Sequence, residues 1–178
     1  MKILTRVIIW DFIAMKNLGF AMILVVTSLG ACNDHDDCTP ESVTTNFTEG
    51  REIVTVFNAA SNSNIYKVEN GNNTVFEYTN AKAQCDNAYD DEKVRKFTFE
   101  VNTEAVQFRF TDKEVKLTNC YFEDVGGWAR GIYEIESGLI EGVKISDGKW
   151  RVNVSVLTVP KFPDEKPERI EFKEVFIK

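Results

Sequence analysis

Side chains that can perform chemistry are sparse in this 178-residue chain. Its single histidine, His35, lies in a polar stretch near the N-terminus and outside the strand-like segments. Histidine is the usual general base for a serine or cysteine nucleophile and the commonest side-chain ligand of catalytic zinc. We therefore expect the folded part of the chain to use neither chemistry, and we predict no metal and no cofactor.

Carboxylates could still form a catalytic pair, because a glycosidase needs two of them facing each other across a cleft. The candidates are Glu134, Glu136 and Glu141, which flank Ser137-Gly138. Acidic residues that alternate with apolar ones are also typical of the solvated face of any sheet. We favour the solvated face and expect no enzyme activity, and a carboxylate-based hydrolase is the lower-ranked alternative.

A second acidic group, residues 86–92 (DNAYDDE), gathers oxygen ligands that suit a hard cation such as calcium. The segment lacks the Asp-x-Asp-x-Asp-Gly spacing of an EF-hand loop. Charge patterning of this kind is more often an acidic surface loop. We favour the surface loop and assign no metal ligands here.

Aromatic residues near Gly126-Gly127 are the candidates for ligand contact. Trp128 follows this glycine pair, and Tyr121 lies shortly before it. Aromatic side chains displayed on loops can stack on sugars or anchor a protein partner. The alternative, which we rank higher for Trp128, is that the ring covers an open end of the core. Trp150 alternates with valines and is predicted to be core.

The N-terminal region is typical of a secretory signal. Lys16 precedes the apolar residues 18–26, and the uncharged stretch 18–31 has 14 residues, fewer than the ~20 that a membrane-spanning helix needs. A compact signal begins at Met15, so we favour Met15 over Met1 as the start of translation. The alternative is an unusually long basic region before the apolar one.

The end of this region, Leu29-Gly30-Ala31-Cys32, resembles the lipobox of bacterial lipoproteins. The resemblance implies a diacylglycerol on Cys32 and a lipid anchor in the outer membrane, facing the periplasm or the cell surface. The acidic residues behind Cys32 resemble the surface-export signal of Bacteroidota lipoproteins, and a generic solvated linker is an equal alternative. Cleavage after Gly30 would instead release a secreted protein. We assign residues 1–31 to the signal, 32–50 to a lipidated acidic tether and 51–178 to the folded domain.

The remaining cysteines fit an oxidising compartment. If Cys32 carries lipid, three cysteines are left, and one disulfide with one spare thiol is expected. Cys85 and Cys120 both lie in the predicted domain, so we favour that pair. Cys38 in the tether could pair with Cys85 instead, because spacing does not decide between them, and three unpaired thiols are the third possibility.

Short strands account for the rest of the chain. Alternation of apolar and polar residues predicts about nine of them, at 52–58, 64–69, 74–79, 96–101, 105–111, 129–136, 139–146, 149–159 and 168–178. Turns are expected at 70–73, 137–138 and 147–148. Residues 115–122 are also favoured as a strand, although Thr111 and Glu114 fit a capping box that would begin a short helix.

This pattern predicts a single all-β, antiparallel domain, an up-and-down barrel or meander, with a β-sandwich as the alternative. The net charge of −7 offers no basic stripe, so we expect no nucleic-acid partner. We predict a protein anchored in the membrane through lipid on Cys32, whose domain binds a small or apolar ligand in a cavity that some of the 13 phenylalanines could line. The alternative is an adhesion or assembly component that binds an envelope protein.

Overall fold

The computed structural model describes residues 38–178 apart from 61–62, 86–92 and 127–130. Residues Cys38–Lys178 form one compact unit. Its elements are β1 (Cys38–Thr39), β2 (Ser42–Asn58), β3 (Ser63–Ala81), β4 (Gln84–Cys85), β5 (Val94–Asn102), β6 (Gln107–Thr111), the 3-10 helix η1 (Asp112–Thr118), β7 (Tyr121–Val125), β8 (Gly131–Ser146), β9 (Lys149–Thr158) and β10 (Arg169–Ile177). The all-β prediction is confirmed.

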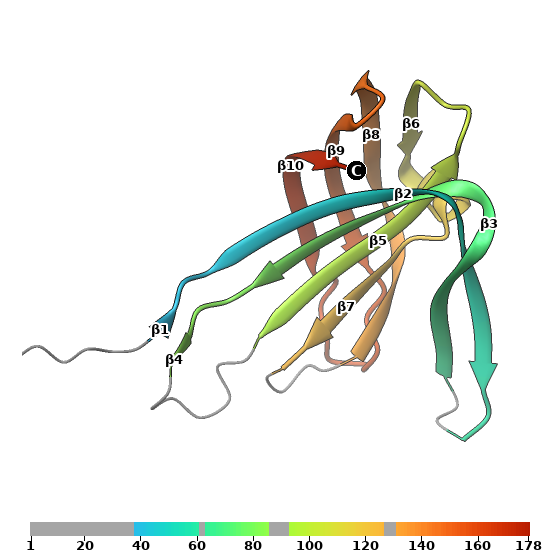
Figure 1. The fold of residues 1–178 in the computed structure, drawn as a ribbon. Helices are drawn as coiled ribbons and strands as arrows, with labels where there is room; N and C mark the ends of the chain where they lie inside the picture. The colour runs from blue at the N-terminus through green and yellow to red at the C-terminus, as the bar shows by residue number, and fades with distance from the viewer. Residues whose placement is uncertain (1–37, 61–62, 86–92, 127–130) are drawn as a thin grey trace, which may run out of the picture. The chain divides into compact units, whose positions relative to one another are not determined.

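Eight of the strands form one sheet, in the order β6-β8-β7-β5-β3-β2-β10-β9 (Figure 1). β8 also pairs with β9, so the last strand of this order is hydrogen-bonded to the second. Every pairing is antiparallel except that of β2 with β10, which is parallel and has a single register pair, Ile177 with Asn46. The sheet is therefore mixed and not a clean barrel. Strands β1 and β4 form a separate two-stranded sheet.

The longest hairpin corrects the sequence prediction. β3 continues through Asn70–Asn73, so the turn expected there is wrong. Gly71 is needed instead for close packing, because a Cβ at this position would lie 2.4 Å from the Cγ of Glu52. Opposite it, the register shifts at Arg51 beside Gly50, whose φ is +71°. Both strands bend there, and we call residues 51–70 beyond the bend the distal hairpin (Figure 1).

A second predicted turn, at Ser137-Gly138, is also wrong. β8 runs through it and changes neighbour, pairing with β7 over residues 131–134 and with β6 over residues 139–143. Gly138 has a φ of +142°, and a Cβ there would lie 2.3 Å from the carbonyl oxygen of Ser155 on β9. Glycine thus permits the close approach of two strands at the bend. The turn predicted at 147–148 is confirmed.

The strand predicted for residues 115–122 is wrong in its first half, where the chain forms η1. Glu114 accepts hydrogen bonds from the Thr111 backbone N–H at 3.1 Å and from its hydroxyl at 3.0 Å. The first of these bonds, together with the Thr111 side chain accepting from the backbone N–H of Glu114, makes the capping box that the sequence offered as an alternative. Val115, which belongs to this helix, is fully buried. The extended backbone resumes only at Tyr121, where β7 begins.

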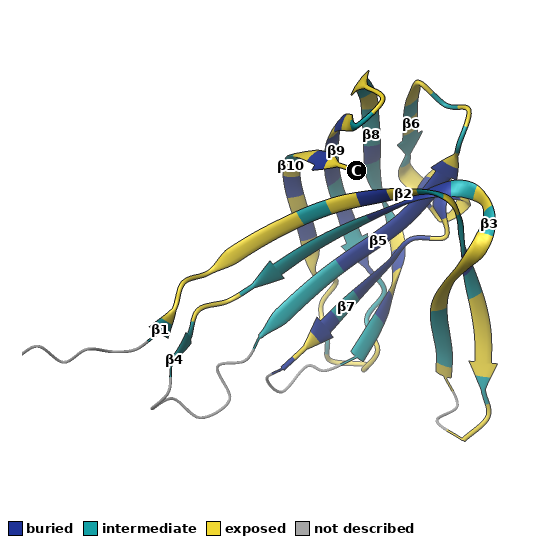
Figure 2. Ribbon diagram, in the orientation of Figure 1, coloured by how far each residue is buried: buried dark blue, intermediate teal, exposed yellow. Residues whose placement is uncertain are grey.

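The core lies inside the sheet and is unusually aromatic. The alternating faces predicted for β9 and β10 are confirmed. On β5 the predicted inward residues Phe97, Phe99 and Val101 lie in the core, but Thr98 and Glu100 between them are buried too, so β5 is dark over a continuous stretch in Figure 2. Phe76 occupies the centre. Its ring lies within 6 Å of five other aromatic rings, those of Phe47 (5.7 Å), Phe99 (4.8 Å), Phe108 (5.7 Å), Trp150 (5.5 Å) and Phe176 (5.5 Å).

The disulfide joins Cys38 to Cys85, so the favoured Cys85–Cys120 pairing is wrong and its alternative is correct. Cys120 is a buried thiol, and burial raises its pKa to about 11. The predicted tether boundary at residue 50 is also wrong. The compact unit begins at Cys38, and residues 42–50 belong to β2.

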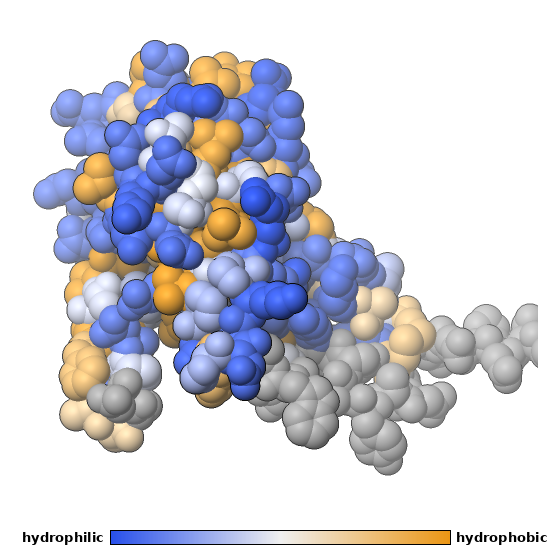
Figure 3. Space-filling model, turned by 180° about the vertical axis from the view of Figure 1, so that it is seen from behind, coloured by the Kyte–Doolittle hydropathy of each residue, from blue (hydrophilic) through white to orange (hydrophobic). Residues whose placement is uncertain are grey.

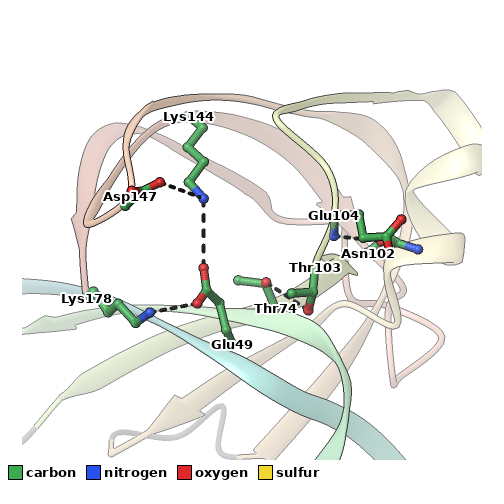
Figure 4. Close-up of polar contacts among 8 residues, drawn as sticks. All are labelled: Glu49, Thr74, Asn102, Thr103, Glu104, Lys144, Asp147 and Lys178. Carbon is green, nitrogen blue, oxygen red and sulfur yellow. Dashed lines mark hydrogen bonds and ion pairs between the residues drawn. The ribbon is translucent and has the colours of Figure 1, made fainter.

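Side chains reinforce the single backbone pairing between β2 and β10. The hydroxyl of Thr45 donates to the carbonyl of Val175 at 2.9 Å. Glu49 lies between Lys178, 2.7 Å from it, and Lys144, 4.0 Å from it (Figure 4). Lys144 also pairs with Asp147 at 3.5 Å, in the β8–β9 turn. These ion pairs tie β2 to β8 and to the end of β10, to which the backbone ladder scarcely connects it.

Candidate functional site

The distal hairpin folds back over the outer face of β7 and β8. The rings of Tyr66 and Tyr121 stack at 4.6 Å, and Ile53, Val75 and Ile132 complete a second small apolar cluster. Tyr121 is therefore buried, and the structure places it beneath the hairpin rather than at a contact surface. Trp128, the other predicted contact residue, lies outside the described residues.

A buried carboxylate fixes the hairpin in this position. Glu100 on β5 accepts a hydrogen bond from the backbone N–H of Ile53 at 2.5 Å. Its other oxygen accepts from the side-chain amide of Asn119 at 2.6 Å. A buried charge whose two oxygens are both hydrogen-bonded specifies geometry strongly, because breaking either bond leaves it partly unsatisfied. Glu100 thus ties the hairpin to β5 and to the end of η1.

Between the distal hairpin, the start of β8 and the β9–β10 connection lies an open cleft of about 750 Å³. This volume is within the range of small-molecule sites. Figure 3, which views the molecule from behind, shows the surface hollowed between the apolar hairpin and the neighbouring connection. Lys161 and Glu134 are the charged residues of the lining, and half of the twelve lining residues have apolar side chains, namely Phe57, Ile65, Ile132, Val159, Pro160 and Phe162. We call this hollow the aromatic cleft.

Two phenylalanines at the cleft are conspicuously exposed. Phe57 at the end of β2 is 61% exposed, and Phe162 in the β9–β10 connection is 67% exposed. A phenylalanine side chain loses about 1.5–3 kcal/mol of burial energy when left in water. Two of them around one hollow form a surface that a ligand could cover.

The polar groups of the cleft centre on Glu134. One carboxylate oxygen, Oε1, accepts hydrogen bonds from the Asn64 side-chain amide at 3.1 Å and from the Tyr66 hydroxyl at 3.5 Å. Burial and the charge of Glu134 raise the pKa of Tyr66, so the phenol stays protonated and keeps donating. The carbonyl of Glu134 accepts from the N–H of Val159 at 2.8 Å, which fixes the β9–β10 connection beside it.

The three carboxylates considered for catalysis do not share a cleft. Glu134 lines the aromatic cleft, and Glu141 lines a separate groove, where it pairs with Arg109. Glu136 is exposed and lines neither hollow. Neither hollow therefore brings together two of the carboxylates that glycoside hydrolysis would need.

The side chains that could bind a metal ion are dispersed among the described residues. Among the described residues, no three His, Cys, Asp or Glu side chains lie close enough together to hold a metal ion. The calcium-like segment 86–92 lies outside these residues. In the described part of the chain, no helix has the length and apolarity to cross a membrane.

Comparison with known proteins does not assign this chain to a family. No family model matches the chain, and no curated protein or solved structure is similar to it.

The cleft residues were missed at the sequence level for a physical reason. Phe57 continues an alternating strand, so its pattern is that of a core residue. Phe162 carried the stronger signal, because it is a large apolar residue in the polar, proline-rich segment 160–167. The convergence of Phe57 with Glu134 depends on the bend in β2 and β3, which the sequence pattern did not reveal.

Proposed function

We propose that this protein is an envelope lipoprotein whose β-domain binds a small, mainly apolar ligand in the aromatic cleft. The observation that carries the proposal is the pair of exposed rings, Phe57 and Phe162, beside the positioned carboxylate of Glu134. Such a mixture of apolar walls with a few convergent polar groups is typical of ligand sites. It supports a ligand that is apolar over most of its surface.

The carboxylate suggests which polar group the ligand carries. The hydrogen bonds that Glu134 receives from described residues both end on Oε1. The other oxygen, Oε2, is left to accept a hydrogen bond from a hydroxyl or an amine. Because the cation Lys161 lines the same cleft, we propose a neutral amphiphile with at least one such donor.

Lipidation at Cys32 is the first expected result. Labelled palmitate supplied to a bacterial host that makes the full chain is expected to enter the protein. Cys32→Ser should abolish incorporation, because the lipobox thiol accepts the diacylglycerol. Cys120→Ser serves as the control and should retain the label, since that thiol is buried. Equal labelling of the two variants would contradict the anchor. The Cys38–Cys85 disulfide supports export, because such bonds persist in oxidising compartments.

Binding in the aromatic cleft is tested with N-phenyl-1-naphthylamine, a neutral apolar fluorophore with one N–H donor. Its fluorescence is expected to rise saturably when the purified protein is added. Phe57→Ala or Phe162→Ala should each weaken binding about tenfold, the effect of losing an aromatic contact worth about 1.4 kcal/mol. Both changes remove an exposed ring, so the stability of the fold should change little.

The matched control for this titration is Leu117→Ala, on η1. Leu117 is 75% exposed and lines neither hollow. Its replacement removes a comparable exposed apolar group and should leave the dissociation constant unchanged. If the two phenylalanine variants bind the fluorophore as tightly as Leu117→Ala does, the aromatic cleft is not the binding site.

A further inference from the structure

A second hollow, of about 630 Å³, lies on the outer face of β6, β8, β9 and β10. It shares no lining residue with the aromatic cleft. Strand register builds it from two adjacent cross-strand rows. The first row consists of Lys173, Asn153, Glu141 and Arg109, one from each strand. Arg151 lies in the second row, between Val175 and Val143. We call this hollow the cationic groove.

The charges in the groove are unbalanced. Arg109, Arg151 and Lys173 face a single carboxylate, that of Glu141. Both oxygens of Glu141 are already used. Arg109 forms an ion pair with Oε2, and the side-chain amide of Asn153 donates to Oε1 at 2.9 Å. Within the described part of the chain, Arg151 and Lys173 have no acidic partner.

This concentration of positive charge runs against the rest of the molecule. The chain carries a net charge of −7, so most surfaces should repel anions. What distinguishes Arg151 and Lys173 from other exposed cations is that both line one hollow. A guanidinium and an ammonium side by side are the groups that proteins use to hold carboxylate and phosphate oxygens.

One wall of the groove beside Arg151 is aliphatic. Val143 lines the groove and is 44% exposed, and it lies next to Arg151 in its row. An oxyanion bound to Arg151 would therefore place the carbon atoms next to its charge against this apolar side chain. Burying that stem would add binding energy in proportion to the area covered. A bare inorganic ion has no stem and could not contact Val143 in this way.

We propose that the cationic groove binds a small organic oxyanion, a carboxylate or phosphate on a short apolar stem. Arg151 and Lys173 hold the charged group, and Val143 contacts the stem. Arg109 is neutralised by Glu141 and forms the rim of the groove. Because only two cations are free, the groove suits one charged headgroup rather than a polyanionic chain.

The test is a titration of the purified full chain followed by the chemical shifts of its backbone amides. The probes are phenyl phosphate, benzoate and the neutral benzyl alcohol. Both anions are expected to shift the amides of the groove residues Glu141, Arg151 and Lys173, whereas the alcohol should leave these amides unshifted. The better-bound anion identifies the headgroup as phosphate or carboxylate. The affinity should fall as salt rises, because the contacts are exposed.

Replacing Arg151 and Lys173 together by glutamine should weaken binding of the better anion at least tenfold, the loss of one charge-assisted hydrogen bond. The matched control is Lys67→Gln with Lys113→Gln, two exposed cations that line neither hollow. Benzyl alcohol shifting the amides of the groove residues as strongly as the anions do would overturn the proposal. So would equal anion binding by the two double variants. Phe57→Ala should leave anion binding unchanged, which separates this site from the proposed function.

Discussion

Replacement of Phe76 by alanine is expected to lower the free energy of unfolding by about 3–5 kcal/mol, the usual cost of emptying a buried phenylalanine site. Phe76 is fully buried, and five aromatic rings surround it. Those rings come from β2, β5, β6, β9 and β10, so no single strand can move inward to fill the cavity. Since small domains are stable by only about 5–15 kcal/mol, the loss should be plain in a urea titration.

Two further variants serve as comparisons for the free energy of unfolding of Phe76→Ala. Phe76→Leu keeps much of the volume and should cost distinctly less than Phe76→Ala. Phe162→Ala removes the same side chain from an exposed position and should change the free energy of unfolding by less than about 0.5 kcal/mol. If Phe76→Ala were as stable as Phe162→Ala, the central position of Phe76 in the core would be wrong.

Loss of the Cys38–Cys85 disulfide is expected to have the second-largest effect, about 2–4 kcal/mol. The bond closes a sequence separation of 47 residues, so reduction gives the unfolded chain considerably more freedom. A reducing agent should lower the urea midpoint of the unaltered protein. It should have no such effect on the double variant Cys38→Ser, Cys85→Ser, which has already lost the bond.

The same measurement distinguishes the two pairings. Cys120→Ala should leave the response to reductant intact, because Cys120 is an unpaired buried thiol. Cys38→Ser should remove the response. The opposite result, with Cys120→Ala losing sensitivity and Cys38→Ser keeping it, would show that Cys85 pairs with Cys120 after all.

Strand positions and their inward faces were predictable where burial imposes a period of two. Phe97 and Phe99 on β5 and Val152 and Val154 on β9 all point into the core as their alternation predicted. The first half of β2 could not be found in this way. Among residues 42–50 only Phe47 is buried, and a strand with one buried residue has no period to detect.

Glycine was the other source of error. A glycine near Asn70 and another beside Ser137 predict turns, because turns are the commonest place for glycine outside regular structure. Gly71 and Gly138 serve instead to let a neighbouring strand approach within a distance that a Cβ would prevent. Local sequence cannot separate the two uses, because the approaching group comes from elsewhere in the chain. The aromatic cleft and the cationic groove depend on these bends, so neither could be assembled from the sequence.

The position of the disulfide has a consequence for where the domain can travel. Cys38 begins the compact unit, and only six residue steps separate it from Cys32. A fully extended chain of that length reaches at most about 20 Å, whereas the 18 steps from Cys32 to residue 50 would have reached about 60 Å. With a lipid on Cys32, as we propose, the first strand is confined to within one small-domain diameter of the bilayer. The protein would then sample a thin layer of solvent at the membrane surface and encounter there the molecules that leave or approach the lipid.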